Sequence, residues 1–317
     1  TTDVGIGVFG GGFADNYYEI RQGHYIQGQS FDGHGGGMSL NVYQLVNPGM
    51  LIPINLVASG GIRYSTYSKD DTDPNFGLPE DQTTMFVRTG VRVAGKEPIL
   101  YPALGLELSV WFERQWRLNA DHYGFADDRE VNPAVNLYWA YAGLNYAWTN
   151  IGHQLSVAVT VGGSDDADRF SAWRLGGVLP LGAEFPLIIP GYYYEELTAK
   201  EFVHLYAAYT IPLESSQRLK FRVEGAAAKL DYLEGFEQRE SWQTGAGCGL
   251  IYSPKSQICT VVLRYGYGFN ALRHGEEGAH SIGLLFQFDL EKRKPSPDDN
   301  HGWRKYLPHA DTTDQSQ

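Results

Sequence analysis

Nine charged residues stand at alternate positions between apolar residues in several extended segments of the sequence. In a β-strand this spacing puts the charges on one face and the apolar side chains on the other. Such a charged face could line a pore, where it would set ion selectivity or hold a plug. In a narrow barrel it could equally form a static network of salt bridges. Both interpretations stay open for these residues, which are Arg63, Arg88, Arg92, Glu107, Glu113, Lys220, Arg222, Glu224 and Arg264.

An acidic loop carries three oxygen ligands spaced as in calcium-binding loops, namely Asp71, Asp73 and Asn75. The rest of the EF-hand pattern is missing. Gly77 lies one place late, and position 82 holds Gln instead of the bidentate Glu. The sequence therefore favours a solvated acidic loop, and we expect neither a metal nor another cofactor.

His280 and Ser281 are the residues that invite comparison with serine hydrolases. Such an enzyme needs its serine, its histidine and an orienting group to converge in space. Adjacent residues of a strand point to opposite faces, so His280 cannot serve Ser281. We therefore expect no catalytic residues and no enzyme activity.

The elements that must position these residues are β-strands, because apolar and polar residues alternate through nearly every segment. Segments 179–189 or 17–27 could add a further strand to those that the alternation marks. The expected number is therefore about 14, within a range of roughly 12–16. The alternation marks strands near residues 4–13, 35–46, 51–66, 84–94, 101–117, 133–148, 152–163, 169–177, 201–213, 217–231, 241–253, 258–271 and 278–290.

Several features favour a transmembrane barrel over a soluble β-sandwich or barrel, since alternation alone fits both. Charges of both signs lie deep in the strands, and aromatic residues such as Trp116, Trp148 and Tyr252 crowd strand ends, as in membrane-interface girdles. Short turns alternate with long loops, as on the two sides of an outer-membrane barrel. The expected fold is all-β: a transmembrane, antiparallel, up-and-down β-barrel.

Composition limits the kinds of binding partner and of membrane-spanning segment that the chain can have. The chain has 317 residues and a formal net charge of −12, which argues against a nucleic-acid partner. No stretch approaches 18 uninterrupted apolar residues, so the sequence predicts no transmembrane helix. The opening residues Thr1, Thr2 and Asp3 do not form a signal peptide, so an exported protein would be represented here by its mature sequence.

The two cysteines, Cys248 and Cys259, flank a predicted turn and both fall on the apolar side of their strands. One interpretation makes them neighbours across two strands, where an oxidising compartment would permit a disulfide. Two lipid-facing thiols that act as small hydrophobic groups fit the pattern equally well.

A longer pattern runs from Arg174 to Leu213: an extended segment ends in Leu-Gly-Gly, a loop rich in Pro and Gly follows, and the next strand ends in Pro-Leu. This order resembles the C-terminal barrel half of BamA/TamA-type outer-membrane proteins, the bacterial surface antigen superfamily. The similarity covers roughly the last 150 residues. In that family an Arg before Gly-Phe or Gly-Tyr locks the loop inside the lumen. Here the position is Pro190, so packing instead of a guanidinium clamp would hold the loop.

We expect the loop at residues 180–196 to lie on the outer side and to fold partly into the barrel mouth. Its apolar residues 187–189 need cover from water, and its tyrosine hydroxyls could reach lumen partners such as Arg222 or Glu224. A mobile surface loop is the alternative. The residues expected in this inserted loop are Pro190, Gly191, Tyr192, Tyr193, Tyr194 and Glu195.

We expect residues 1–290 to form the barrel and residues 291–317 a polar C-terminal tail, with both termini periplasmic. The resemblance then implies a channel, or the membrane-embedded subunit of a larger outer-membrane complex, without periplasmic domains because the chain leaves no room for them before Val4. A stand-alone passive porin is the alternative, and an outer-membrane enzyme is the second alternative. Expected partners are outer-membrane lipid or lipopolysaccharide and, through apolar tail residues such as Trp303, other outer-membrane or periplasmic proteins.

Overall fold

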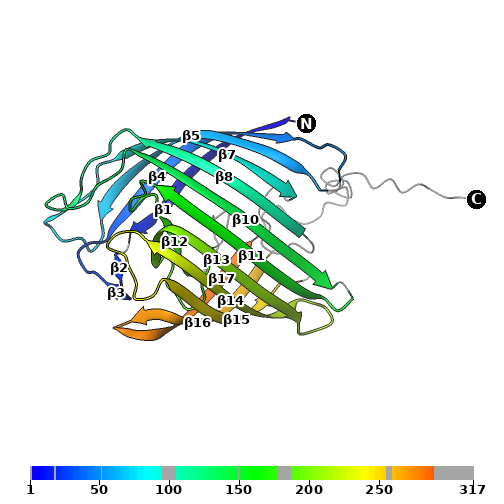
Figure 1. Cartoon of the computed structure of the whole chain (residues 1–317). Helices are drawn as coiled ribbons and strands as arrows, with labels where there is room; N and C mark the ends of the chain where they lie inside the picture. The colour runs from blue at the N-terminus through cyan, green and yellow to red at the C-terminus, as the bar shows by residue number, and fades with distance from the viewer. Residues whose placement is uncertain are drawn as a thin grey trace, which may run out of the picture.

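One large antiparallel sheet dominates the computed structural model, which describes residues 2–17, 19–50, 52–94, 105–148, 150–177, 187–254 and 259–288. Its long strands follow one another in chain order and curve into a barrel (Figure 1). They are β1 (Thr2–Tyr17), β4 (Phe31–Leu45), β5 (Ile54–Lys69), β7 (Gln82–Ala94), β8 (Gly105–Arg117), β10 (Ala134–Trp148), β11 (His153–Asp165), β13 (Leu197–Pro212), β14 (Leu219–Tyr232), β15 (Trp242–Tyr252), β16 (Cys259–Arg273) and β17 (Glu276–Phe288).

Five short strands lie near one end of the barrel. The strand β12 (Trp173–Leu175) pairs with the start of β13. The strands β2 (Ile20–Arg21) and β3 (His24–Tyr25) form a small hairpin, and β6 (Phe76–Gly77) pairs with β9 (Gly124–Phe125). In the described part of the chain, no helix has the length and apolar character needed to cross a membrane.

The pleat of the strands separates an apolar outer face from a more polar inner face. In β8, Val110 is 62% exposed whereas the next residue, Trp111, is 3% exposed. The exposed positions of this strand carry Leu106, Leu108 and Phe112, while Glu113 is buried on the inner side. A large apolar surface that faces outward on most strands is the inverse of a water-soluble protein and suits a lipid environment.

The two ends of the barrel differ, as the sequence predicted. Short connections join β4 to β5, β10 to β11 and β13 to β14 at the end where β1 begins and β17 ends. Long loops gather at the opposite end, which we call the long-loop end (Figure 1). Among the described residues, the ladder of hydrogen bonds runs from β1 to β17 and none joins these two edge strands.

The all-β barrel is confirmed, but the strand inventory needs correction. The described sheet has 13 strands, and one of them, β12, is only 3 residues long. The segment 169–177 is a strand only at β12. It begins with a turn, because the Asp168 carboxylate accepts hydrogen bonds from the backbone N–H groups of Phe170 and Ser171. Segment 17–27 yields only the β2–β3 hairpin, and residues 178–186 lie outside the described residues, as does the expected tail at 291–317.

The two cysteines are free thiols. Cys248 lies opposite Val223 and Tyr265, whereas Cys259 lies opposite Phe288. They are therefore not cross-strand neighbours. Of the two interpretations, the structure agrees with two unbonded thiols and not with a disulfide.

Candidate functional site

The first group of lumen charges lies on β7 and β8. Arg88 and Glu113 are directly opposite each other, and Arg88 Nε donates to Glu113 Oε2 at 2.6 Å. Gln115 Nε2 donates to the other carboxylate oxygen at 2.7 Å. Nearby, Arg92 Nε lies 3.0 Å from Glu107 Oε1. Each cation here has a carboxylate beside it, so this wall of the lumen is close to neutral.

The second group lies on β13, β14 and β16 around Glu224. Its carboxylate accepts hydrogen bonds from Arg264 Nη2 at 2.8 Å and from the Tyr206 hydroxyl at 2.5 Å. Arg222 Nε lies 3.3 Å from the same carboxylate, and its Nη2 donates to the Tyr206 oxygen at 2.6 Å. Two guanidinium groups therefore share one carboxylate, which leaves this wall cationic.

The structure places all nine predicted charges at inner-face positions and brings seven of them into these two groups. The Arg63 guanidinium lies 5.8 Å from the centre of the Phe86 ring, and Lys220 is half-buried near the short-turn end of β14. Six of the nine side chains are cationic and three are acidic, although the whole chain has a formal charge of −12. Whether these groups select ions or only brace the wall stays a prediction.

The loop that leads into β13 packs inside the barrel against strand glycines. Ile189 and Tyr192 are 0% and 1% exposed. Side chains on the wall would collide with the loop: an added Cβ at Gly245 would lie 2.1 Å from the Pro190 carbonyl oxygen, and one at Gly266 would lie 2.5 Å from the Gly191 nitrogen. We call this surface the glycine seat; it consists of Gly245, Gly247, Gly266 and Gly268 on β15 and β16.

Polar contacts with three strands hold the loop on the glycine seat. His204 Nε2 lies 3.0 Å from the Ile188 carbonyl oxygen. The Gly191 N–H donates to Ser281 Oγ at 3.1 Å, and the Tyr192 hydroxyl donates to Gln243 Oε1 at 2.6 Å. The barrel wall thus supplies partners for buried polar groups of the loop, which otherwise would cost stability.

A guanidinium clamp closes the loop, which corrects the expectation that packing alone would hold it. Arg273, at the end of β16, donates to the buried Glu196 carboxylate at 2.6 and 2.9 Å. Its guanidinium also lies 3.7 Å from the centre of the Tyr193 ring. The carboxylate therefore comes from the loop and the arginine from the wall, the reverse of the arrangement that the resemblance implies. A second pair joins Glu195 to Arg174 at 2.5 Å.

Tyr192 and Tyr193 of the inserted loop contact other residues than the partners that the sequence suggested. Tyr206 on β13, not a loop tyrosine, contacts Arg222 and Glu224. Tyr192 points to Gln243, and burial raises the pKa of its hydroxyl, so this group stays a neutral donor. Tyr193 and Tyr194 are 50% and 54% exposed.

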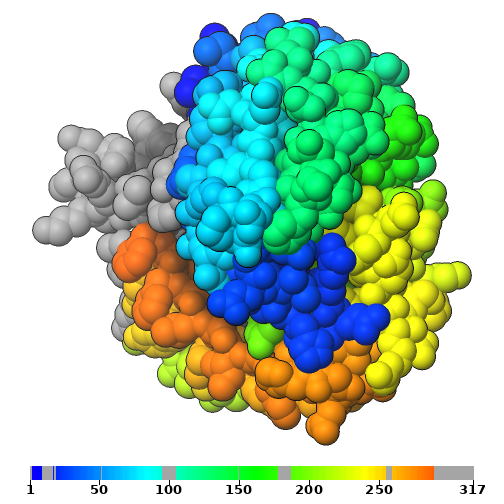
Figure 2. All heavy atoms as spheres, turned by 90° about the vertical axis from the view of Figure 1, so that its left-hand side faces the viewer, coloured from blue at the N-terminus to red at the C-terminus, as the bar shows by residue number. Residues whose placement is uncertain are grey.

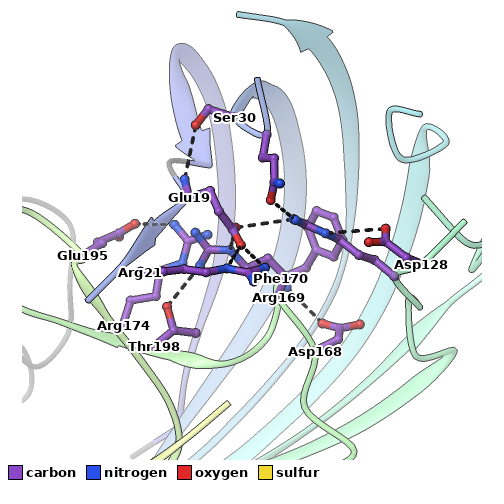
Figure 3. A network of polar contacts seen from close by, with 12 residues as sticks. Glu19, Arg21, Ser30, Asp128, Asp168, Arg169, Phe170, Arg174, Glu195 and Thr198 are labelled. Atoms are coloured by element: carbon purple, nitrogen blue, oxygen red, sulfur yellow. Dashed lines mark hydrogen bonds and ion pairs between the residues drawn. The ribbon is translucent and has the colours of Figure 1, made fainter. Parts of the chain in front are cut away.

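Loops at the long-loop end meet around a single buried carboxylate, which the sequence did not reveal (Figure 3). Glu19, 1% exposed, lies 2.7 Å from Arg21, 3.4 Å from Arg129 and 3.9 Å from Arg169. Burial, together with the Arg174 charge, lowers the pKa of Arg169 to about 9 while Glu19 opposes the shift, so Arg169 is cationic at neutral pH. Arg117 and Asp168 form a further buried pair beside it.

Aromatic side chains pack beneath this network. Phe31, Phe76, Tyr123 and Val131 form a buried cluster at the long-loop end, and the ring of Phe170 packs against it. Viewed from that end, the blue segment around residues 19–30 lies across the middle of the barrel mouth, next to the orange β16–β17 hairpin (Figure 2). Loops and inserted loop together therefore cover this end of the lumen.

Comparison with known proteins shows which solved structures this barrel is similar to. No family model and no curated protein matches the sequence. Among solved structures, BamA from Haemophilus ducreyi lacking POTRA domains 1–3 superimposes with a TM-score of 0.58 at 9% identity, over 90% of this chain and 59% of that one. CdiB from Acinetobacter baumannii gives a TM-score of 0.56 at 12% identity, over 81% of this chain and 43% of that one.

This chain has the fold of the BamA/TamA-type outer-membrane β-barrels. The resemblance seen in the sequence is confirmed at the level of the barrel. The chain spans less than two thirds of either solved relative, and at these identities the likeness concerns the fold.

Two candidates from the sequence remain, the acidic loop at Asp71–Asn75 and the pair His280 and Ser281. Asp73 Oδ1 accepts the Asn75 N–H at 2.8 Å, so the Asp71–Asn75 segment forms a turn, and within the described ranges no three His, Cys, Asp or Glu side chains gather as a metal site. His280 faces outward, 2.7 Å from the Tyr265 hydroxyl, whereas Ser281 faces the lumen and accepts a hydrogen bond from the inserted loop.

Proposed function

We propose that this chain is an integral outer-membrane β-barrel that acts as a gated conduit, or as the membrane-embedded subunit of a larger outer-membrane complex. Its long-loop end would face outward and its short-turn end the periplasm, as in outer-membrane barrels generally. In this proposal the inserted loop keeps the lumen closed at rest. The proposal includes no enzymatic step.

The observation that carries the proposal is the fit between the inserted loop and the glycine seat. Glycine inside a strand weakens it, since it has no side chain to pack and loses more conformational entropy on folding. Two pairs of glycines lie on the inner faces of β15 and β16 despite this cost. The close approach of Pro190 and Gly191 explains them, because any larger residue there would collide with the loop. The close fit between the wall and the loop therefore favours a gated barrel over a pore that stays open.

A passive porin is the competing function, and in it the inserted loop could not close the lumen. In a porin the loop would leave a continuous aqueous path at rest. The six cationic and three acidic lumen residues would then favour anions. The same preference is expected of the gated barrel once its loop has moved.

Planar-bilayer recordings of the purified protein can separate the two functions. We expect the wild type to be electrically silent. Arg273→Gln, which breaks the clamp on the buried Glu196, should produce openings that favour anions. The matched control is Arg239→Gln, because Arg239 forms an exposed ion pair with Glu277 at the same end, at 3.2 Å and with 58% of its side chain accessible. This control should stay silent.

Steady, large unit conductance from the wild type would refute the gated barrel and favour the porin. Folding of each variant is checked by the heat-dependent shift in gel mobility that folded barrels show. A folded but silent Arg273→Gln variant would contradict the role given to the clamp.

A further inference from the structure

The cation Arg114 lies on the lipid-facing side of the barrel. Arg114 occupies an outward position of β8, between the outward Phe112 and Trp116, and is exposed. Its guanidinium lies 5.4 Å from the centre of the Trp116 ring. In the described part of the chain, no carboxylate lies within 4.0 Å of it. An arginine on the lipid face is costly at the bilayer midplane, and near the membrane interface it can reach water or pair with an anion.

An apolar groove of about 1050 Å³ opens on the outer face beside this cation. Its walls include Met38, Leu40, Ile62, Met85 and Trp116, and Gly60 lies in its floor. The row of cross-strand partners runs from Arg114 to Val87 and then to Gly60. The guanidinium therefore stands at the edge of the groove.

The groove has open space at Gly60, which has no side chain. A Cβ added there would meet nothing closer than the Phe86 carbonyl oxygen at 3.8 Å, so the space above it is open. The lining residues come from β1, β4, β5, β7, β8 and the start of β10. Because neighbouring strands are about 4.8 Å apart, the groove is roughly 20 Å wide, which is wider than a single acyl chain needs.

We propose that this groove and Arg114 bind a phosphorylated glycolipid of the lipopolysaccharide class, with its phosphate on the guanidinium and its acyl chains in the groove. The proposal rests on the outer-membrane placement proposed above, with the long-loop end outward. Arg114 lies three residues before the end of β8 on that side, where the phosphates of the outer leaflet would lie. Arginine binds phosphate through paired N–H donors, and tryptophan favours the same interface.

Native mass spectrometry of the detergent-solubilised, full-length chain tests the proposal, with lipid A and phosphatidylglycerol as the probes. The wild type should retain lipid A. Arg114→Gln should weaken binding about tenfold, the loss expected for a hydrogen bond to a charged group. Gly60→Leu, which fills the groove without a backbone clash, should weaken it similarly. Lys229→Gln should bind as the wild type does, because Lys229 is an exposed outward cation beside Trp242 on β14, distant from the groove in the sheet.

Three results would overturn the inference. The first is unchanged retention of lipid A by folded Arg114→Gln and Gly60→Leu. The second is an equal loss in Lys229→Gln, which would mean that any surface cation suffices. The third is equal or tighter binding of phosphatidylglycerol that also depends on Arg114, which would identify a glycerophospholipid as the occupant. Clamp variants should retain lipid A, so failure of the gating proposal and failure of this one give different results.

Discussion

Replacement of Gly191 by Ala should expel the inserted loop from the lumen. Gly191 has φ +92°, and a Cβ there would lie 1.8 Å from the Gly268 nitrogen and 2.4 Å from the Tyr267 carbonyl carbon. Both obstacles are backbone atoms of β16, which cannot give way without breaking the sheet. The control is Gly49→Ala in the β4–β5 turn, because Gly49 has φ +86° and nothing within 4 Å of its added Cβ.

The two variants share the backbone strain and differ in the clash. A left-handed conformation costs an L-residue about 1 kcal/mol, and both variants bear that cost. Unseating the loop also breaks three neutral hydrogen bonds at about 1 kcal/mol each and the Glu196–Arg273 clamp at about 2 kcal/mol. The loop is therefore anchored by roughly 5 kcal/mol, which keeps its open fraction below about 1 in 10³ in the wild type.

Limited digestion with chymotrypsin from the outer side measures this release. The folded wild type and Gly49→Ala should resist cleavage at Tyr192, which is 1% exposed. Gly191→Ala should be cut rapidly at the bond after Tyr192 while its strands stay intact. The reasoning would be refuted by a Gly191→Ala variant as resistant as Gly49→Ala, or by a wild type that is cut readily at the same place.

Two further predictions address the barrel wall and the loops. Val223→Arg, on the outer face of β14, should destabilise the barrel in lipid vesicles by about 2–4 kcal/mol. Lys220→Gln, on the inner face, should cost less than about 1 kcal/mol. Equal costs in urea titrations would contradict the assignment of faces. Burial raises the pKa of Tyr123 to about 12, so the stability that its neutral form contributes is complete below pH ~10 and is lost as the pH rises towards 12. The tyrosinate absorbance that Tyr123→Phe removes should therefore titrate near pH 12, and a midpoint near 10 would contradict its burial.

The strands were predictable because their signal is local. In 101–117 the alternation of side chains predicted a strand, and β8 runs from Gly105 to Arg117. In 169–177 the same reasoning failed, because nearby backbone N–H groups donate hydrogen bonds to the Asp168 carboxylate and so favour a turn over a ladder. Side-chain chemistry within four residues decided this outcome, and periodicity does not report it.

The inner-face position of the lumen charges also followed from alternation, since a residue's parity fixes its face. The clamp did not, because Glu196 and Arg273 are 77 positions apart and meet only where β16 shifts register between Gly268 and Leu272. Glu19 and Arg129 are likewise 110 positions apart, on segments that the folded barrel brings together. Contacts of this kind depend on the curvature of the whole sheet.

The claim that the inserted loop fills the lumen is tested most directly by the accessibility of this loop in intact cells. In a background with Cys248 and Cys259 replaced by serine, Tyr194→Cys and Ile189→Cys are exposed in turn to a membrane-impermeant maleimide from outside. Tyr194 is 54% exposed and Ile189 is 0% exposed, so the first should label rapidly and the second only after unfolding. Labelling of Ile189→Cys as fast as Tyr194→Cys would show that the loop does not fill the lumen.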